Sequence, residues 1–290
     1  MQPEGRLREL LAASGAVACG FAEAGPVEES EWQFFERWLE KGYHAGMAYM
    51  GNHREIRRDP RLLLPGARTL ISTAFNYRQP NPYREIATYA LGEDYHKVLR
   101  RKLRAVVRQM KEEFGGAWRI CIDSAPVLER YWARKCGIGR RSSYHGNIIV
   151  EGVGSMVFLA EIITTLSLAP TGELPPVEPE EAREAARSCP TGALMAEGMI
   201  DSRRCINYLT IEKRGELTDE EQSLMEKAGR GRLFGCDACQ LADPCNRGEA
   251  VIIDEFRPYP NLREIISSLE HGEEKGVPVN SPLRRSPLIR

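Results

Sequence analysis

The alternation of apolar and polar residues along the first 168 residues predicts helices and strands in turn. Apolar residues three and four positions apart mark helices, and continuous apolar or β-branched runs mark buried strands. The expected helices are an opening helix around Leu7, Leu10 and Leu11 and the segments 31–41, 95–114 and 126–135. The expected strands are segments 17–21, 68–77, 117–122 and 155–168. This order favours an α/β layer, which we expect to form a first domain over residues 1–168.

The composition of the chain changes after residue 168. Four prolines, Pro170, Pro175, Pro176 and Pro179, mark a linker. An acidic, alanine-rich segment follows at 180–187, and we expect it to form a short helix because alanine and glutamate are good helix formers. The segment 169–256 carries most of the cysteines and is expected to be a second domain. Residues 257–290 are rich in proline and basic residues and are expected to form a tail or docking arm.

The overall composition is that of an ordinary globular protein. Of 290 residues, 42% are hydrophobic and 28% are charged, with a formal net charge of −1, so no global positive field draws the chain toward nucleic acid. The N-terminus lacks the apolar core of a secretory signal, and no stretch reaches the length of a membrane span. We therefore expect a cytoplasmic protein without a membrane partner, in which clustered cysteines are metal ligands rather than disulfides.

Four cysteines have the pattern of a metal-binding set. Cys189 precedes a proline, as the last cysteine of a bacterial ferredoxin signature does, and Cys236 and Cys239 form a Cys-x-x-Cys pair. Cys205 lies between them, on a helix that Asp201 or Ser202 caps. Four thiolates suit one 4Fe-4S cluster, although a structural zinc uses the same number. Two of the ligands stand alone, which favours the cluster over zinc.

The sequence also lacks the ligands of a second cluster. A two-cluster ferredoxin pattern has cysteines ten, seven and four positions before Cys189, where this chain has Pro179, Ala182 and Ala185. The pattern also has a cysteine where Asp243 stands. All four missing thiolates belong to the same cluster, so we expect one cluster. Cys245, two residues beyond the vacated position, is interpreted as a bystander.

The order and spacing of several motifs resemble the epoxyqueuosine reductases, a family of corrinoid and iron–sulfur enzymes of queuosine synthesis in tRNA, related to reductive dehalogenases. The motifs are RxxP with LLPG at 57–66, YALGEDYHKVLR at 89–100, IDSAPVLER at 122–130, CGIG at 136–139, CPTGAL at 189–194, RRCINYLTIE at 203–212 and GCDACQ…NR at 235–247. The resemblance implies an α+β fold, with a nitroreductase-like α/β domain that binds cobalamin followed by a ferredoxin-like domain.

The resemblance also assigns roles to single residues. It makes Asp123 the proton donor, with a pKa that partial desolvation is expected to raise; the alternative is that Asp123 caps the helix beginning near Pro126. Arg57 matches a corrinoid-contacting arginine, with a surface salt bridge as the alternative. The other expected cofactor-binding residues are Tyr89, Asp94, His96, Asp123 and Ser124. For His96 a structural hydrogen-bonding role is the main alternative.

Three classes of function follow from these assignments. The first is a reductase that uses cobalamin and one 4Fe-4S cluster, takes electrons from an external donor and acts on tRNA. The second is a corrinoid-binding or electron-transfer protein without a tRNA substrate, because the chain ends where members of the family continue into helices that help to grip tRNA. The third is a scaffold in which a cluster or zinc only stabilises the fold. A monomer is expected in each case.

Overall fold

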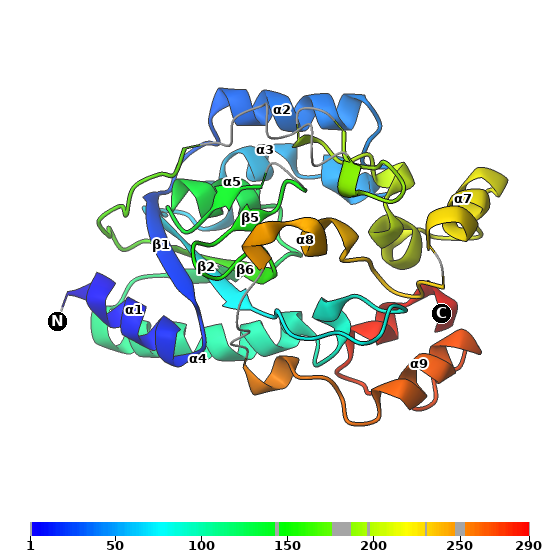
Figure 1. Cartoon of the computed structure of the whole chain (residues 1–290). Helices are drawn as coiled ribbons and strands as arrows, with labels where there is room; N and C mark the ends of the chain where they lie inside the picture. Colours follow the sequence, from blue (N-terminus) through cyan, green and yellow to red (C-terminus); the bar gives the residue numbers. More distant parts are fainter. Residues whose placement is uncertain are drawn as a thin grey trace.

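The fold is built around one sheet with helices on both faces (Figure 1). It is described here from a computed structural model, in residues 2–142, 145–175, 187–195, 198–229, 231–246 and 253–289. The expected helix at 180–187 lies almost wholly outside the described residues. Within them, no helix is long and apolar enough to cross a bilayer.

The elements occur in the order that the hydrophobic pattern predicts. The α-helices are α1 (Pro3–Ala13), α2 (Glu29–Glu40), α3 (Arg54–Arg58), α4 (Tyr95–Phe114), α5 (Glu129–Lys135), α7 (Asp219–Leu224), α8 (Ala238–Ala242) and α9 (Leu262–Glu270). The strands are β1 (Ala18–Glu23), β2 (Thr69–Asn76), β3 (Trp118–Cys121), β4 (Arg140–Arg141), β5 (Ile148–Ile149) and β6 (Val157–Thr164). The short helices used below are η3 (Thr88–Ala90), η6 (Ser202–Arg204) and η11 (Pro282–Arg285).

The main sheet has the strand order β1-β2-β6-β3, and every neighbouring pair is antiparallel. Phe21 and Ile71 face a core shared with α1 and α4. Ala22 and Leu70, one position along each strand, face the other core, shared with α2 and α5. Successive strand residues point to opposite faces, so both faces must be apolar when helices cover both. The mixed helix and sheet fold class is confirmed, and the pairing is antiparallel throughout.

Residues 257–290 do not form a tail. Four residues of α9 at helical spacing, Leu262, Ile265, Ile266 and Leu269, are buried against Leu91, Phe234 and Leu283. Of the two expectations for this segment, a tail or a docking arm, the free tail is wrong, because this apolar face packs in a third hydrophobic cluster. Gly92 allows the chain before α9 to approach closely, since a Cβ there would lie 2.6 Å from the carbonyl oxygen of Arg257.

Two segments far apart in the sequence are held together beside the sheet. Asp237, between the paired cysteines, accepts hydrogen bonds from the backbone N–H and the hydroxyl of Thr88, both at 2.7 Å. Gly235 has φ +78° and a Cβ there would lie 2.7 Å from that of Ala87, so the site requires glycine. The cysteine pair is therefore fixed directly against the segment that carries Tyr89.

Candidate active site and cluster site

The four candidate cluster ligands come from three separate segments. Cys189 lies in the loop before β-bridge residue Leu194, Cys205 follows η6, and Cys236 and Cys239 flank the start of α8. All four are free thiols of intermediate exposure. Burial and the nearby charges of the other three cysteines raise the pKa of Cys239 to about 12. The fold has therefore made neighbours of residues up to fifty positions apart.

Backbone N–H groups surround these sulfur atoms. The N–H of Ala193 donates to the Sγ of Cys189 at 3.3 Å. Backbone hydrogen bonds from Asn207 and Tyr208 favour the thiolate of Cys205. Hydrogen bonds to sulfur help proteins to hold iron–sulfur clusters and to set their potentials. The surroundings of the thiols thus fit such a cluster.

Among the residues that the structure describes, no group of three or more histidine, cysteine, aspartate or glutamate side chains is arranged to hold a single metal ion. The four thiols are the ligand number of a 4Fe-4S cluster and also of a structural zinc.

Asp243, at the vacated ligand position, is engaged elsewhere. Its carboxylate accepts from the hydroxyl of Ser142 at 3.0 Å and lies 3.3 Å from Nε2 of His145. It also accepts from the backbone N–H of Cys245 at 2.9 Å. Burial alone would raise the pKa of Asp243, but these hydrogen bonds outweigh it and lower the pKa. A buried polar network therefore occupies the position where a second cluster would need a thiolate.

Asp123 lies in the loop after β3 in an unusual backbone conformation. Its φ of +51° is in the left-handed region, where aspartate and asparagine are tolerated better than most residues. Its N–H donates to Oε1 of Glu129 at 2.6 Å, which holds the turn in place. The N-cap of α5 is Leu128, so Asp123 does not cap that helix. Its side chain is 59% exposed and free to meet a ligand.

A chain of charged groups links Asp123 to the C-terminal segment. The Nε2 of His96 lies 3.0 Å from Oδ2 of Asp123, and its Nδ1 lies 2.8 Å from Oδ1 of Asp94. Asp94 is also the N-cap of α4 and accepts from the guanidinium of Arg285 at 2.8 Å. His96 thus bridges two carboxylates, one exposed and one buried.

The protonation states of Asp123 and His96 differ from the expectation. Loss of solvent alone would raise the pKa of Asp123, but the hydrogen bond and charge of His96 outweigh it and lower the pKa. For His96 the balance is reversed: burial lowers the pKa, and hydrogen bonds to Asp123 and Asp94 raise it further than burial lowers it. The prediction of a raised Asp123 pKa is wrong. Of Asp123 and His96, the side chain that carries the proton between them is His96.

Two further acids lie beside Asp123. Burial and the charge of Asp123 raise the pKa of Glu129 to about 8. Burial, followed by the proximity of Glu129, raises the pKa of Glu161 well above its ordinary value. Glu161 is fully buried in β6, where Ser72 donates to one of its carboxyl oxygens at 3.1 Å. At neutral pH Glu129 therefore keeps its proton, whereas the lowered pKa of Asp123 favours its carboxylate.

Arg57 is buried and lacks a partner. It is 6% exposed, its buried Nε has no hydrogen-bond partner, and no described residue forms a hydrogen bond or ion pair with its guanidinium. The guanidinium carbon lies 5.6 Å from the ring centre of Phe35. The alternative of a surface salt bridge therefore fails. A buried guanidinium without a partner is costly unless a ligand supplies one, so Arg57 fits a polar cofactor.

Tyr89 and Ser124 lie near the same group of charges. Tyr89 packs edge-on against Phe158, with ring centres 6.4 Å apart. Burial raises the pKa of its phenol well above the ordinary value, and the charge of Asp123 adds to this effect. Ser124 is exposed, and its hydroxyl donates to the carbonyl of Ile122 at 3.1 Å. Both residues therefore lie in the neighbourhood of Asp123.

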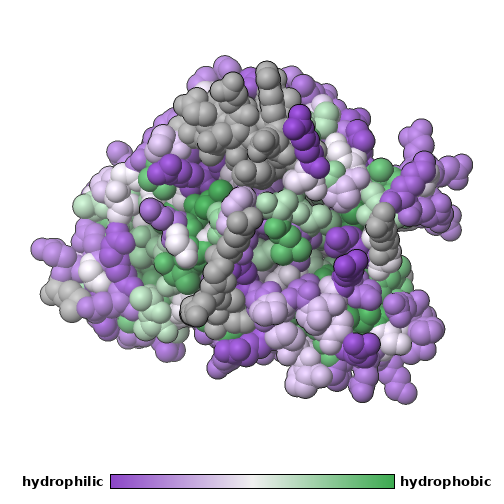
Figure 2. Space-filling model, in the orientation of Figure 1, coloured by the Kyte–Doolittle hydropathy of each residue, from purple (hydrophilic) through white to green (hydrophobic). Residues whose placement is uncertain are grey.

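Arg130 connects this acid site with the cysteines. The charges of Glu129, Cys239 and Asp123 all act on its guanidinium. Beside Cys239, Leu241 is 68% exposed, and Figure 2 shows hydrophobic surface over α8. The site therefore combines a candidate cluster, an arginine and an acid within one region of the fold.

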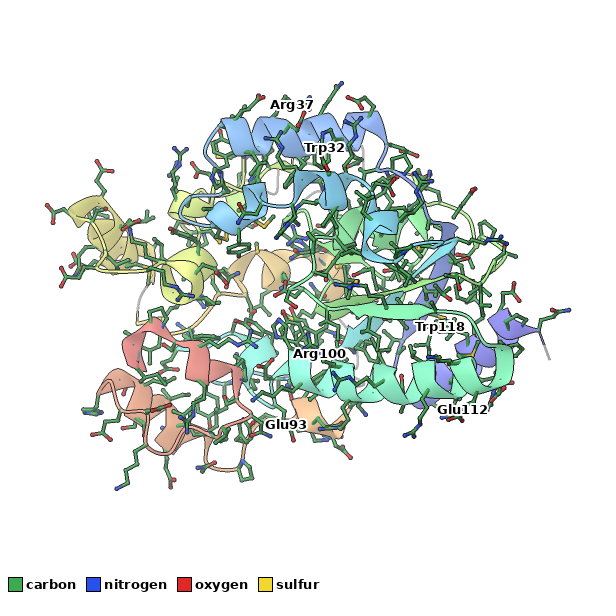
Figure 3. All side chains as sticks on the ribbon, turned by 180° about the vertical axis from the view of Figure 1, so that it is seen from behind. Trp32, Arg37, Glu93, Arg100, Glu112 and Trp118 are labelled. Atoms are coloured by element: carbon green, nitrogen blue, oxygen red, sulfur yellow. The ribbon has the colours of Figure 1, made fainter. Side chains whose placement is uncertain are left out.

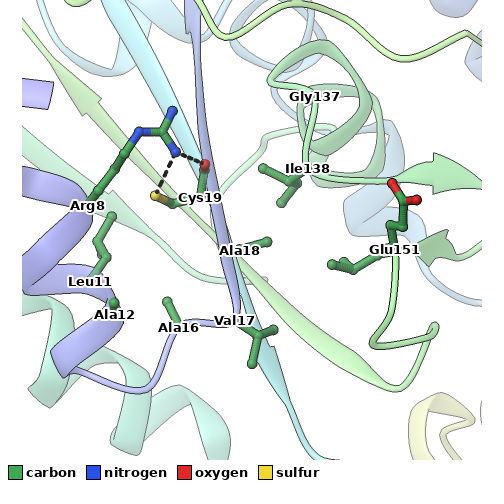
Figure 4. Close-up of a pocket in the computed structure, with 11 residues that line it drawn as sticks. Arg8, Leu11, Ala12, Ala16, Val17, Ala18, Cys19, Gly137, Ile138 and Glu151 are labelled. Carbon is green, nitrogen blue, oxygen red and sulfur yellow. Dashed lines mark hydrogen bonds between the residues drawn. The ribbon is translucent and has the colours of Figure 1, made fainter. Parts of the chain in front are cut away.

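A separate cavity of about 430 Å³ lies away from this region (Figure 4). It is lined by the end of α1, the start of β1 and the chain near Ile138 and Glu151, and Arg8 donates there to the carbonyl of Cys19 at 2.9 Å. None of the candidate site residues lines it. It therefore has no part in the chemistry derived below.

Sequence reasoning missed several residues of the site. Glu161 could have been found, because it is a lone acid within an apolar strand. Glu129 and Arg130 belong to a motif that was noticed, but only its aspartate and serine were selected. Arg285 gave no local signal, since its partner Asp94 lies 191 positions earlier in the chain.

The fold and the site together define an iron–sulfur protein with a polar ligand site next to its cluster. A family model described as "Epoxyqueuosine reductase QueG, DUF1730" matches residues 57–124, and one described as "4Fe-4S double cluster binding domain" matches residues 183–246. An epoxyqueuosine reductase from Cyclobacterium marinum is 39% identical over 257 residues, which cover 85% of this chain and 80% of that protein. The chain belongs to the epoxyqueuosine reductase family.

Solved structures of this family have the same fold. A crystal structure of an epoxyqueuosine reductase with an epoxyqueuosine-modified tRNA-Tyr stem loop superposes with a TM-score of 0.78 at 29% identity, covering 89% of this chain and 69% of the other. A structure from Bacillus subtilis, with its aspartate-bearing catalytic loop swung out of the active site, gives 0.76 at 29% identity and the same two coverages.

Proposed function

We propose that this protein is an iron–sulfur reductase that converts epoxyqueuosine in tRNA to queuosine. The observation that carries the proposal is that Asp123 and two of the four cysteines, Cys239 and Cys205, act electrostatically on the same guanidinium, that of Arg130, in a chain of this family. A redox centre and a proton-handling group are thereby close enough to act on one substrate. An external electron donor and a monomeric state are part of the proposal.

The cluster is proposed to be single and of the 4Fe-4S type. Its ligands are Cys189, Cys205, Cys236 and Cys239, whose sulfurs are neighbours and accept backbone hydrogen bonds. The matching family model names a double cluster, but Asp243 is committed to a hydrogen-bonded network at a second-cluster position. A carboxylate is also a poor match for iron–sulfur ligation.

The second cofactor is proposed to be cobalamin. Arg57, Tyr89, Asp94, His96, Asp123 and Ser124 are the residues that would hold it or line its site. The buried, unpaired guanidinium of Arg57 supports this, because a polar group of the cofactor would supply the missing partner. When bound, the corrinoid would supply the substrate with the low-potential electrons that it receives from the cluster.

The protein's own contribution to the reaction is the proton. Removing an epoxide oxygen as water consumes two electrons and two protons and leaves a carbon–carbon double bond. His96 can pass its Nε2 proton to Oδ2 of Asp123 across 3.0 Å, and Asp123, which is exposed, can then deliver it to the leaving oxygen. The Bacillus subtilis relative also has its catalytic aspartate on a loop, which supports this role for Asp123.

The test is turnover of an epoxyqueuosine-containing tRNA stem loop. The anaerobically reconstituted protein, with cobalamin and a chemical reductant, should remove one oxygen atom from the nucleoside, measured by mass spectrometry. Asp123→Asn should keep iron and cobalamin but lose roughly 10²–10⁴-fold in rate. Asparagine tolerates the left-handed backbone, so the variant tests the proton and not the fold. No turnover by the loaded wild-type protein, or full activity of the variant, would contradict the proposal.

A further inference from the structure

A groove lined by positive charge begins beside Asp123 and runs along α4. It has a volume of about 460 Å³ and is lined by His96, Lys97, Arg100, Arg101, Arg104 and Arg285. Five of these come from the first half of α4, and Arg285 comes from η11 of the C-terminal segment. The chain as a whole has a net charge of −1, so this groove is a local concentration of cations.

The C-terminal segment completes the groove at its end nearest Asp123. Lys97 donates to the carbonyl of Val279 at 2.8 Å, and the N–H of Asp94 donates to the carbonyl of Asn280 at 2.6 Å. Figure 3 shows this segment packed at the end of α4 that carries Arg100. The position of Arg285 is therefore fixed by the fold.

Two of the cations have no partner in the protein. Arg101 pairs with Glu255 at 3.0 Å, and Arg285 pairs with Asp94 at 2.8 Å. By contrast, no described residue forms a hydrogen bond or ion pair with the side chain of Arg100 or Arg104, and both residues are exposed. They lie one helical turn apart, about 6 Å along the axis, so the cations repeat along the groove.

We propose that this groove binds the phosphate backbone of the substrate RNA and directs the modified nucleotide to Asp123. The proposal rests on the proposed function for the identity of the RNA, and it adds the surface that binds it. Cations that repeat every turn match a polymer of regularly spaced anions, and the groove offers no apolar anchor for a membrane or a protein helix. His96 lines the groove and also reaches Asp123 at 3.0 Å, so bound RNA lies next to the proton donor.

The test compares two double variants on the same helix. Arg100→Gln with Arg104→Gln removes both free cations, and Arg108→Gln with Lys111→Gln removes the same charge from exposed positions outside the groove. Gln is as good a helix former as Arg or Lys, so α4 should persist in both. Iron content and circular dichroism confirm that each variant is folded.

The measurement is the affinity for a labelled RNA stem loop as salt is varied. Each phosphate contact contributes about 0.7–0.9 to the slope of log K against log salt, so the groove variant should lose roughly 1–2 units of slope. Its affinity should fall on the order of tenfold or more at 0.1 M salt, whereas the matched variant should bind like the wild type. Equal slopes for the groove variant and the wild type, or equal losses in both variants, would overturn the proposal.

Binding is measured with the unmodified stem loop and without turnover, so the two proposals fail separately. If the wild type binds RNA through the groove but never reduces epoxyqueuosine, the groove stands and the proposed function falls. If turnover is normal but the groove variant binds RNA as tightly as the wild type, the groove falls and the function stands.

Discussion

Asp123 and Glu129 are neighbouring carboxyl groups that the fold holds in different protonation states. Partial loss of solvent raises the pKa of Asp123, but His96 outweighs this effect and lowers it, whereas burial together with the charge of Asp123 raises the pKa of Glu129 to about 8. Sites of proton transfer typically contain two acids whose surroundings shift their pKa values in opposite directions. At neutral pH Glu129 thus holds a proton next to the ionised carboxylate of Asp123.

Replacing Glu129 by Gln should change how stability depends on pH. The ordinary glutamate pKa is 4.5 and that of folded Glu129 is about 8, so between these values the folded protein binds more protons and loses stability as the pH rises. The glutamine of Glu129→Gln stays neutral at every pH. The melting temperature of the variant, relative to that of the wild type, should therefore increase by at least about 2 °C as the pH rises from 5 to 8. Thermal unfolding across this range measures it.

The control is Glu112→Gln, which removes a carboxyl from an exposed position on α4 (Figure 3). A gain that is the same in both variants, or a constant offset between Glu129→Gln and the wild type, would show that Glu129 holds no proton at neutral pH.

Cys236 and Cys245 provide a matched pair of substitutions. Cys236→Ser replaces a soft ligand by a hard one, so the protein should lose its cluster and most of its iron. Cys245→Ser should keep the iron, because Cys245 lies two residues beyond the vacated ligand position and outside the expected ligand set. Colorimetric iron assays on anaerobically prepared protein decide this. Iron loss on replacing Cys245 would make it a ligand.

Single residues could be predicted only as far as local motifs reach. The cysteines and Asp123 belong to short motifs, and the structure places Asp123, Cys205 and Cys239 where all three act on the guanidinium of Arg130. The pKa of Asp123 was predicted in the wrong direction because His96, its main electrostatic partner, comes 27 positions earlier. Such a pairing is decided by packing, which the sequence pattern does not contain.

Among the elements, α4 was the most predictable and α9 the least. The expected segment 95–114 is the observed helix, because Asp94 caps its start and Gly115 ends it at φ +72°. In α9, the same periodic spacing was present but lay among prolines and basic residues, which favoured a tail. The alternation of strands with helices also left strand direction open, and hydrogen bonding made every pair of the main sheet antiparallel.

The burial of α9 predicts that the C-terminal segment stabilises the protein. Ile265 is fully buried in the third hydrophobic cluster, so Ile265→Ala should lower the free energy of unfolding by about 2–5 kcal/mol. Glu264→Ala, exposed on the same helix, should change it by less than about 0.5 kcal/mol. Urea unfolding measures both. Equal, small effects would return residues 257–290 to the status of a tail.

At the scale of the whole molecule, the two predicted domains share one site. The hydrogen bonds of Asp237 with Thr88 tie the Cys-x-x-Cys pair to the segment before α4, and α9 packs on both regions through Leu91 and Phe234. The boundaries at 168 and 256 stay predictions. Under the proposed function, this arrangement would bring electrons from the cluster and a proton from Asp123 to one substrate.

The central claim is an epoxyqueuosine-type reductase that works with one 4Fe-4S cluster. The most direct measurement is iron and sulfide quantitation of anaerobically purified protein, combined with EPR of the reduced state. We predict about four irons and about four sulfides per chain and the signal of one isolated cluster. About eight irons, a spectrum broadened by a second nearby cluster, or stoichiometric zinc without iron would contradict the account.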